Sequence, residues 1–380
     1  MLQQVKNKNL NDSIGEEKLE LLLEEASLNG SRRRERYPDS RFFGYFCSYW
    51  PEEIVLAAGY EPLRLFPAPI QAVPASLPAY CCSLARGCLS RAEKGDYADL
   101  AGTGFAHTCD TMQCLGGIWQ AVAGHVDNTL QCVPPVLLEA PGARRYYLTE
   151  LQNLLSKIGR LTGREPGKID LIRALDLCRQ IRRQAAELDK MRPYLPSPLV
   201  PALLRAGQVM PGTEFSAALE RVIPVLKERM AEPGDRCRVL VTGAVLENDS
   251  LFKMVEDLGG RVVADDMCTG YRHYYDQLSQ PDTPDPLEAI VQRAANMPPC
   301  PCRSRGHDYR INYLEQLALE KNAAGAVLVI RKYCEPHAWD AVPAAEQLRK
   351  SGIRTMVLEL EGADVGGQER TRLQAFLESI

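Results

Sequence analysis

The chain has 380 residues, enough for two domains and an additional helical unit. Its formal net charge of −4 excludes the strongly basic composition of a nucleic-acid-binding domain. The apolar runs have the length of strands, short of the roughly 20 residues that span a bilayer, and residues 1–12 lack the apolar stretch of a secretory signal. We therefore expect a cytoplasmic protein that binds neither nucleic acid nor membrane.

Thirteen cysteines are the unusual feature of the composition. Stable disulfides are not expected for a chain of this size in a reducing compartment. The thiols are therefore either buried packing groups or metal ligands, and we expect both kinds. Cys178, for example, falls among apolar residues of a predicted helix, which favours packing.

The predicted elements begin with a helical N-terminal extension over residues 1–40, in which leucines share one face. From residue 41 to 142, short β-branched and aromatic runs alternate with helical patterns. Such alternation is typical of a parallel α/β domain. The four strands predicted for this domain cover residues 41–49, 61–66, 100–106 and 136–140.

Residues 143–232 show helical periodicity without strand signals and are predicted to form a helical insert or linker. Residues 233–380 return to the alternating pattern and are predicted to form a second α/β domain. The expected fold class is α/β, with two Rossmann-like or flavodoxin-like domains whose four-stranded sheets are mostly parallel. The strands predicted for the second domain cover residues 236–243, 261–267, 326–330 and 353–360.

Two stretches share one order of features: a buried strand, a polar break, a cysteine and an acid. In residues 97–119, the predicted strand ends at His107 and delivers Cys109 into a loop. Near the C-terminus, the strand that ends at Ile330 is followed by three polar residues and then by Cys334. In parallel α/β sheets, ligands bind outside the carboxyl ends of the strands. Both cysteines are therefore expected to contribute to one shared site.

Cys47 and Cys268 also end predicted strands, one in each predicted domain, so four thiols converge if the two sheets face each other across a cleft. Four thiolates suit zinc, although structural zinc sites usually draw their ligands from close pairs. Iron–sulfur clusters also take cysteine thiolates, and a cluster with three protein cysteines leaves one iron open. Buried thiols without any metal are the third alternative, because cysteine is among the most buried residue types. Spacing alone leaves all three open.

The candidate catalytic side chains are Ser48, Glu53 and His107, which lie close to Cys47 or Cys109 in the sequence. Each has a structural alternative: Glu53 is also placed to interact with the dipole of the helix that it begins, and a histidine often caps or packs. Glycine-rich phosphate-binding motifs are missing from the sequence, so an intrinsic nucleotide site is not indicated.

Motifs from nearly the whole chain after about residue 40 resemble, in order, the 2-hydroxyacyl-CoA dehydratase / benzoyl-CoA reductase family, whose type member is 2-hydroxyglutaryl-CoA dehydratase. The motifs are GYFCSYWPEEIVLAAGYEPLRLF at 44–66, HTCDTMQCLGGIW at 107–119, VLVTGAVLEN at 239–248 with VVADDMCTGYR at 262–272, GAVLVIRKYCEP at 325–336 and GQERTRLQAFLE at 367–378.

This resemblance implies that Cys47, Cys109 and Cys334 hold one 4Fe–4S cluster in the cleft between the two domains, with the fourth iron free of cysteine. It also implies a partner, a separate ATP-hydrolysing iron–sulfur activator that supplies a low-potential electron. In the dehydratases of the family that electron drives radical dehydration of a 2-hydroxyacyl-CoA thioester, and in the reductases it reduces an aromatic ring. Use of ATP by the activator agrees with the missing phosphate-binding motif in this chain.

The extra cysteines resemble those of one branch of the family, the double-cubane cluster proteins, which are homodimeric reductases of small molecules. Their six ligands would correspond to Cys47, Cys82, Cys109, Cys114, either Cys300 or Cys302, and Cys334. The choices between Cys81 and Cys82 and between Cys300 and Cys302 stay open. A third alternative is a non-catalytic, cluster-bearing subunit of a heterodimer with a paralogous chain.

Overall fold

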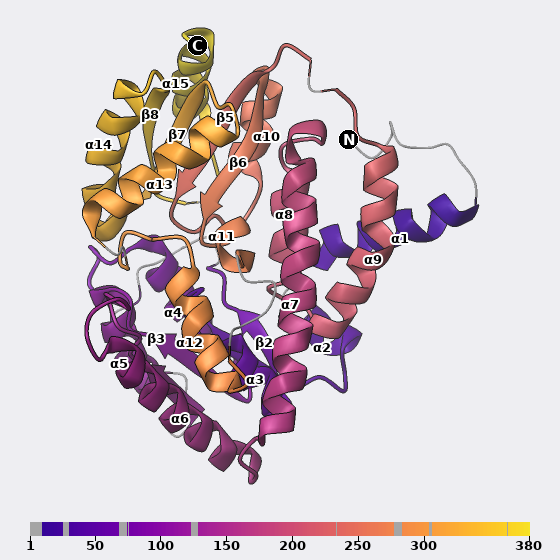
Figure 1. The fold of residues 1–380 in the computed structure, drawn as a ribbon, viewed down its shortest axis with the longest axis vertical. Coiled ribbons are helices and arrows are strands. Elements are labelled where there is room, and N and C mark those ends of the chain that lie inside the picture. Colours follow the sequence, from indigo (N-terminus) through magenta and orange to yellow (C-terminus); the bar gives the residue numbers. More distant parts are fainter. Residues whose placement is uncertain are drawn as a thin grey trace.

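The computed structural model contains two four-stranded sheets within the part of the chain that it describes, and both sheets are entirely parallel (Figure 1). Helices flank each of them. The predicted α/β fold class with two parallel four-stranded sheets is therefore confirmed. The described residues are 10–25, 30–67, 74, 76–122, 128–232, 234–276, 283–303, 306–362 and 364–380.

The first sheet has the strand order β2-β1-β3-β4. β1 (Phe42–Tyr45) lies between β2 (Glu61–Arg64) and β3 (Gly102–Ala106), and β4 (Thr129–Cys132) forms one edge. All four residues of β1 are buried. We call this sheet and the helices packed on it the first half of the molecule.

Both faces of the first sheet are covered, and β1 shows why its sequence is continuously apolar. Phe42 packs on one face with α4 (Ser83–Glu93) and α5 (Asp110–Val122). The next residue, Phe43, packs on the opposite face, in the core that contains α3 and α6. Successive residues of a strand point to opposite faces, so a strand covered on both sides needs apolar side chains throughout. These two helices span Glu52–Ala57 and Ala143–Thr162.

Gly104, in the centre of β3, leaves the space that the Trp50 ring fills. A Cβ at residue 104 would lie 2.2 Å from a ring carbon of Trp50, and that ring is 1% exposed. We expect Gly104→Ala to lower the free energy of unfolding by about 1–3 kcal/mol, as overpacking typically does, measured by denaturant unfolding. Gly117→Ala, which meets open space in α5, is the control and should be neutral or slightly stabilising. Equal stability of Gly104→Ala and wild type would contradict this packing.

The second sheet has the order β6-β5-β7-β8 and is also covered on both faces. α10 (Ser250–Asp257) and α15 (Gly367–Glu378) pack on one face, and α13 (His307–Glu320) and α14 (Glu335–Lys350) pack on the other. We call this sheet and these helices the second half. Its strands are β5 (Cys237–Gly243), β6 (Gly260–Met267), β7 (Gly325–Arg331) and β8 (Arg354–Leu360).

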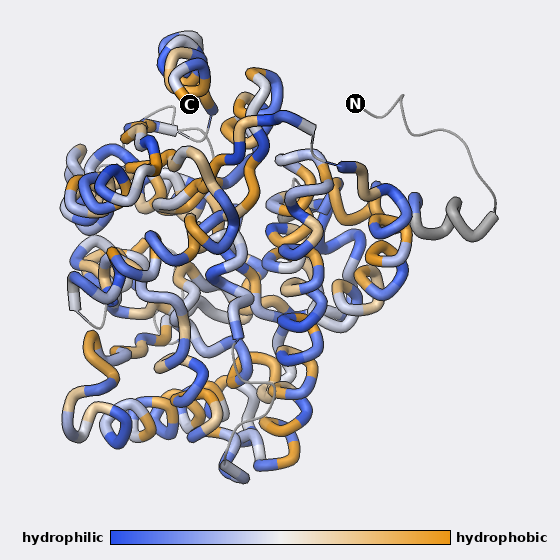
Figure 2. Tube along the Cα trace, turned by 45° about the horizontal axis from the view of Figure 1, so that its top comes forward, coloured by the Kyte–Doolittle hydropathy of each residue, from blue (hydrophilic) through white to orange (hydrophobic). Residues whose placement is uncertain are grey.

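A group of helices lies beside both sheets, as Figure 1 shows. α7 contacts α3 of the first half and α11, which follows β6. α1, α8 and α9 share a further core, and hydrophobic and hydrophilic positions alternate along the helices in Figure 2. The bounds are α1 (Leu10–Glu25), α2 (Gly30–Arg36), α7 (Lys168–Met191), a 3-10 turn (Arg192–Tyr194), α8 (Leu199–Ala206), α9 (Gly212–Glu228) and α11 (Tyr271–Tyr274).

α12 (Pro286–Asn296) returns the chain to the first half between β6 and β7. Its apolar side chains join the core that contains Phe43, and it contacts α6 and α7. The segment that follows α12 is thereby brought close to the first sheet. The domain boundaries at residues 40, 142 and 232 stay a prediction.

Two local predictions are wrong. The predicted strand at 136–140 is a turn, and the edge strand is β4, because Pro134 and Pro135 cannot donate the backbone hydrogen bonds of a ladder. Val136 is accordingly 61% exposed. Cys109 does not enter a loop: α5 begins at the next residue, Asp110, whose carboxylate suits the positive end of a helix.

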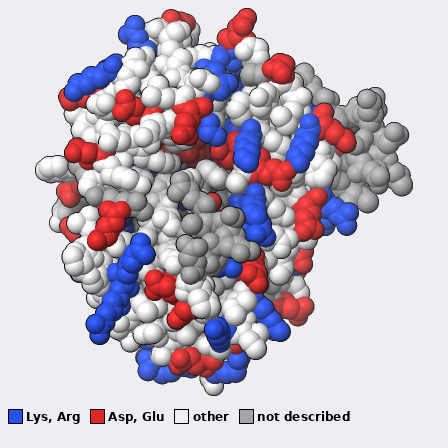
Figure 3. All heavy atoms as spheres, in the orientation of Figure 1, with Lys and Arg blue, Asp and Glu red and all other residues white. Residues whose placement is uncertain are grey.

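Residues 1–9 and 26–29 of the predicted N-terminal extension lie outside the described residues. None of the helices in the described ranges is both long enough and apolar enough to cross a membrane. Basic and acidic side chains are interspersed over the face of the molecule that Figure 3 shows.

Candidate functional site

The carboxyl ends of strands from both sheets meet at a cavity of about 110 Å³. Residues that directly follow β1, β3, β5 and β6, and the turn after β7, line it, which is where parallel sheets usually bind ligands. Seven of the thirteen cysteines lie on its wall, and we call it the cysteine cavity. These cysteines are Cys47, Cys82, Cys109, Cys268, Cys300, Cys302 and Cys334.

The three predicted cluster ligands all line the cysteine cavity, and each precedes a helix. Cys109 immediately precedes α5, and Cys334 is the N-cap residue of α14. Cys47 lies in the turn before α3, where its carbonyl accepts a hydrogen bond from the Trp50 N–H at 2.9 Å. The N-terminal end of a helix carries partial positive charge, which favours a thiolate nearby.

Burial and hydrogen bonding act in opposite directions on these thiols. Burial raises the pKa of Cys47 to about 11, against the Thr108 hydroxyl, which lies 3.5 Å from its sulfur, and the Tyr49 N–H. Burial likewise raises the pKa of Cys334 to about 12, against the His337 N–H. Such thiols are costly to ionise alone and become thiolates readily when a metal supplies positive charge.

A second group of thiols forms around Cys302. Hydrogen bonding with Cys302 lowers the pKa of Cys109 and lowers that of Cys300 to about 6. The pKa of Cys302 is raised in return. The three sulfur atoms therefore interact directly, although two of them follow α12 and the third ends β3.

Arg303 fixes the turn at 300–302 against the first half. Its guanidinium donates to the His107 carbonyl at 2.8 Å and to the Pro135 carbonyl, and it lies over the Tyr49 ring at 5.4 Å. The backbone of Arg303 pairs with that of the first turn residue in an isolated bridge. This anchoring explains how a turn in the C-terminal part of the sequence reaches the end of β3.

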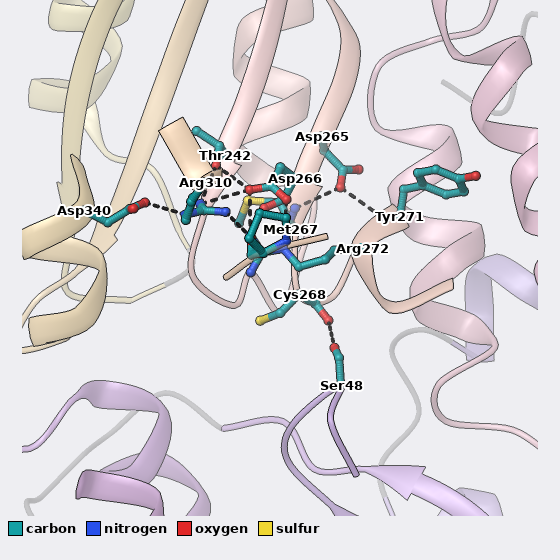
Figure 4. A network of polar contacts seen from close by, with 11 residues as sticks. Ser48, Thr242, Asp265, Asp266, Met267, Cys268, Tyr271, Arg272, Arg310 and Asp340 are labelled. Atoms are coloured by element: carbon teal, nitrogen blue, oxygen red, sulfur yellow. Dashed lines mark hydrogen bonds and ion pairs between the residues drawn. The ribbon is translucent and has the colours of Figure 1, made fainter. Parts of the chain in front are cut away.

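The Cys268 carbonyl joins the two halves across the cysteine cavity. It accepts hydrogen bonds from the Ser48 hydroxyl at 2.8 Å and from Arg64 Nη1 at 2.5 Å, and Arg64 also donates to Ser48 at 3.1 Å. Figure 4 shows Ser48 reaching up from the first half to this carbonyl. Ser48, a predicted catalytic candidate, therefore lies on the cavity wall with its hydroxyl already engaged.

A buried ionic network stands behind this wall (Figure 4). Asp266 accepts from Arg272 Nε at 2.8 Å, from Arg310 Nη2 at 3.0 Å and from the Thr242 hydroxyl at 2.8 Å. Arg310 also pairs with Asp340 at 2.7 Å. Burial opposes ionisation of Asp266, but the two arginines hold its pKa below the usual value. Arg272, which lines the cavity, is thereby held in one position.

Arg331 is a further cation on the wall that the sequence prediction did not single out. It ends β7, three residues before Cys334, and is 2% exposed. Its Nη2 pairs with Glu247 at 2.8 Å, while its Nε and Nη1 are buried without a hydrogen-bond partner. The only sequence signal was its place directly before the cysteine motif.

Of the additional predicted ligands, the structure brings Cys82, Cys300 and Cys302 to the cysteine cavity. It leaves Cys114 outside: this thiol is exposed, and its nearest interacting thiol is that of Cys81. In place of Cys114, the cavity wall includes Cys268, which the sequence analysis placed at a strand end.

The other two catalytic candidates do not line the cysteine cavity. Glu53 is completely buried and forms an ion pair with Arg182 of α7, which holds its pKa below the usual value despite burial. His107 contributes its backbone carbonyl to Arg303, and its Nε2 is buried without a hydrogen-bond partner. These placements favour the structural alternative for Glu53.

The donor set suits a metal–sulfide cluster. Within the described residues, no three His, Cys, Asp or Glu side chains form a group that could hold a single metal ion. The seven thiols instead surround a cavity, and the ligands of an iron–sulfur cluster bind different iron atoms, so they stand further apart. Thiolates are also the ligands that such clusters prefer.

The family model described as "2-hydroxyglutaryl-CoA dehydratase, D-component" matches residues 47–380. The chain belongs to this family. The match begins at Cys47 and thus includes all seven cysteines of the cavity. The resemblance expected from the sequence motifs is confirmed.

Among characterised members related to the D-component family are components of dehydratases and of a reductase. The beta subunit of (R)-phenyllactyl-CoA dehydratase from Clostridium sporogenes is 22% identical over 87% of this chain and 90% of its own length. The beta subunit of lactoyl-CoA dehydratase from Anaerotignum propionicum is 24% identical over 89% and 91%. A benzoyl-CoA reductase subunit from Thauera aromatica is 24% identical over 95% and 96%. An enzymatic role within the family is therefore supported.

Proposed function

We propose that the chain is an iron–sulfur protein that takes a low-potential electron from a separate ATP-hydrolysing activator for radical dehydration or reduction of an acyl-CoA thioester. The observation that supports this most is the convergence of Cys47, Cys109 and Cys334 at the cysteine cavity, although 287 positions separate the first from the last (334 − 47). The names of the relatives supply the two reaction classes.

Cys47, Cys109 and Cys334 would hold a 4Fe–4S cluster, which supplies one-electron reduction and an iron without a cysteine ligand. The apolar side chains of Phe46 and Met112 line the same wall and exclude water from it. The remaining wall residues orient the ligands and keep both halves in register.

His337 is the candidate for a neutral hydrogen-bonding group in the cysteine cavity. It lines the cavity, and burial together with Arg272 and Arg310 lowers its pKa well below the usual value. At neutral pH its imidazole is therefore uncharged, so one ring nitrogen accepts a hydrogen bond. It would accept a hydrogen bond from a substrate hydroxyl without adding charge.

A second candidate function is a homodimeric reductase of small molecules that carries a bridged double-cubane cluster. The observation that favours it is the presence of Cys82, Cys300 and Cys302 on the same wall as the three principal ligands. Cys82 rather than Cys81 is then the ligand, since Cys81 does not line the cavity. Cys268 is better placed than Cys114 to complete the set.

A third candidate is a cluster-bearing partner subunit that does not itself bind substrate. Two of the relatives are named as beta subunits of dehydratases, and the third is one subunit of a reductase. A paralogous partner chain would then supply the substrate site. Turnover of an acyl-CoA thioester by this chain and the activator alone would exclude this candidate.

Iron and acid-labile sulfide per chain, measured with EPR on protein purified without oxygen, test the proposal. About four irons would support a single cubane and a dehydratase-type subunit, and about eight would support the double cubane. Protein that contains zinc and no iron would contradict both.

We expect Cys114→Ala to keep the wild-type iron content, because the Cys114 thiol is exposed and lies outside the cavity wall. Cys82→Ala is the matched comparison, since that thiol is buried on the wall. If wild type binds about eight irons, Cys82→Ala should lose roughly half of them. Iron loss from Cys114→Ala would show that its position outside the cavity is wrong.

A further inference from the structure

Arg331 is the charged group on the wall of the cysteine cavity that neither the ligand set nor the ionic network explains. The other two arginines on this wall are held by protein partners: Arg64 by Ser48 and the Cys268 carbonyl, and Arg272 by Asp266. Arg331 has one such contact, between its Nη2 and Glu247 at 2.8 Å. Its Nε and Nη1 have none.

These two nitrogen atoms are well buried, since the whole residue is 2% exposed. Leaving a buried donor without an acceptor costs on the order of 1–3 kcal/mol, and more for a charged group. Among the described side chains of the cavity wall, Arg331 is the one with buried polar atoms that lack a partner. Its free donors therefore point to an acceptor that belongs in the cavity.

The neighbourhood of Arg331 identifies the chemistry of this acceptor. Arg331 is close enough to the Cys82 thiol to favour its ionised form, against the burial that raises the pKa of Cys82. It is also joined to Cys334 by a tight turn, in which the Cys334 N–H donates to the Arg331 carbonyl at 2.8 Å. An anionic, sulfur-rich group bound by these thiolates would thus lie beside the guanidinium.

We propose that Arg331 is the residue that donates hydrogen bonds and positive charge to the sulfur atoms of the cluster, and that the Arg331–Glu247 pair sets its reduction potential. This inference rests on the proposed function, which places the cluster in the cysteine cavity. Reduction adds one electron, supplied by the activator, to a group that is already anionic. Hydrogen bonds and nearby positive charge stabilise the reduced form and raise the potential.

The test is a redox titration followed by EPR on anaerobically purified protein without substrate, after iron has been counted. Arg331→Met should keep the wild-type iron content and shift the reduction potential to a more negative value. Arg331→Lys, which retains the charge but loses the planar fork of donors, should give a smaller shift in the same direction. Glu247→Gln removes the opposing charge and should shift the potential the other way.

Arg205→Met is the matched control. Arg205 is 5% exposed and pairs with Asp249 at 2.7 Å, but it does not line the cavity. Its removal should leave the potential unchanged.

Two negative results are distinguishable. Wild-type protein without iron would overturn the proposed function, whereas iron-loaded Arg331→Met with the wild-type potential would overturn only the role of Arg331. If Arg331→Met altered substrate binding alone, the acceptor would be an anionic substrate group instead, and the proposal would fail. Should Arg331→Met not fold, an unchanged potential in both Arg331→Lys and Glu247→Gln would overturn it equally.

Discussion

Replacing Cys47, Cys109 or Cys334 by alanine is expected to strip most of the iron from the protein, each substitution on its own. The three thiols line one cavity and are supplied by both halves, so none of them can stand in for another. Removing an outer hydrogen-bond partner of a metal ligand typically costs about 10–100-fold in affinity, and loss of a ligand itself should cost more. Iron and sulfide per chain after anaerobic purification measure the effect.

Cys178→Ala and Cys132→Ala are the controls for this experiment. Both thiols are buried, burial raises the pKa of each, and neither lines the cysteine cavity. Both variants should retain all of their iron. Full retention in Cys47→Ala, Cys109→Ala or Cys334→Ala would remove that residue from the ligand set.

Asp266→Ala is expected to lower the free energy of unfolding by about 3–5 kcal/mol, the usual cost of breaking a buried ion pair. Asp266 is completely buried, and its loss would leave Arg272 and Arg310 without their shared counter-ion. Because the folded-state pKa is lowered, this stabilisation is present at neutral pH and is lost as the pH falls below about 3.9. Denaturant unfolding of metal-free protein at two pH values measures both effects.

Asp96→Ala provides the contrast, because it removes an ion pair at the surface. Asp96 pairs with Arg91 at 2.9 Å and is 43% exposed, so the change should be under about 1 kcal/mol. A similar loss of stability in both variants would mean that the Asp266 network contributes no more than a surface pair.

The second sheet was the most predictable part of the fold. β5, β6 and β7 are seven or eight residues long and almost entirely buried, so their apolar runs are long enough to be recognised in the sequence. β4 has only four residues, and its centre includes the polar Gln131. A run of that length and composition carries no clear strand signal, and the exposed apolar residues after Pro135 were mistaken for it.

The site divides in the same way. Cys47, Cys109 and Cys334 were identified because each directly follows a strand, and a parallel sheet brings such positions to one edge. Cys114 was misplaced because α5 was not recognised: its buried positions are Met112, Leu115, Gly116 and Trp119, which turn Cys114 toward solvent.

The arginines of the cavity wall were beyond reach of the sequence for a different reason. Arg331 meets Glu247, 84 positions away, and Arg64 meets Cys268, 204 positions away. Local periodicity carries no information about partners at such separations. Only the packing of the two halves shows which charges face the cavity and which are neutralised behind it.

The wide spacing of the cavity cysteines also bears on biogenesis. A polypeptide that is still being synthesised lacks Cys334 until most of its 380 residues have been made, so an inorganic cofactor held by Cys47 and Cys334 has to be delivered late. By then Ser48 and Arg64 already clamp the Cys268 carbonyl. Maturation would therefore require this clamp to open and close again, which makes it the hinge point where an assembly factor would act.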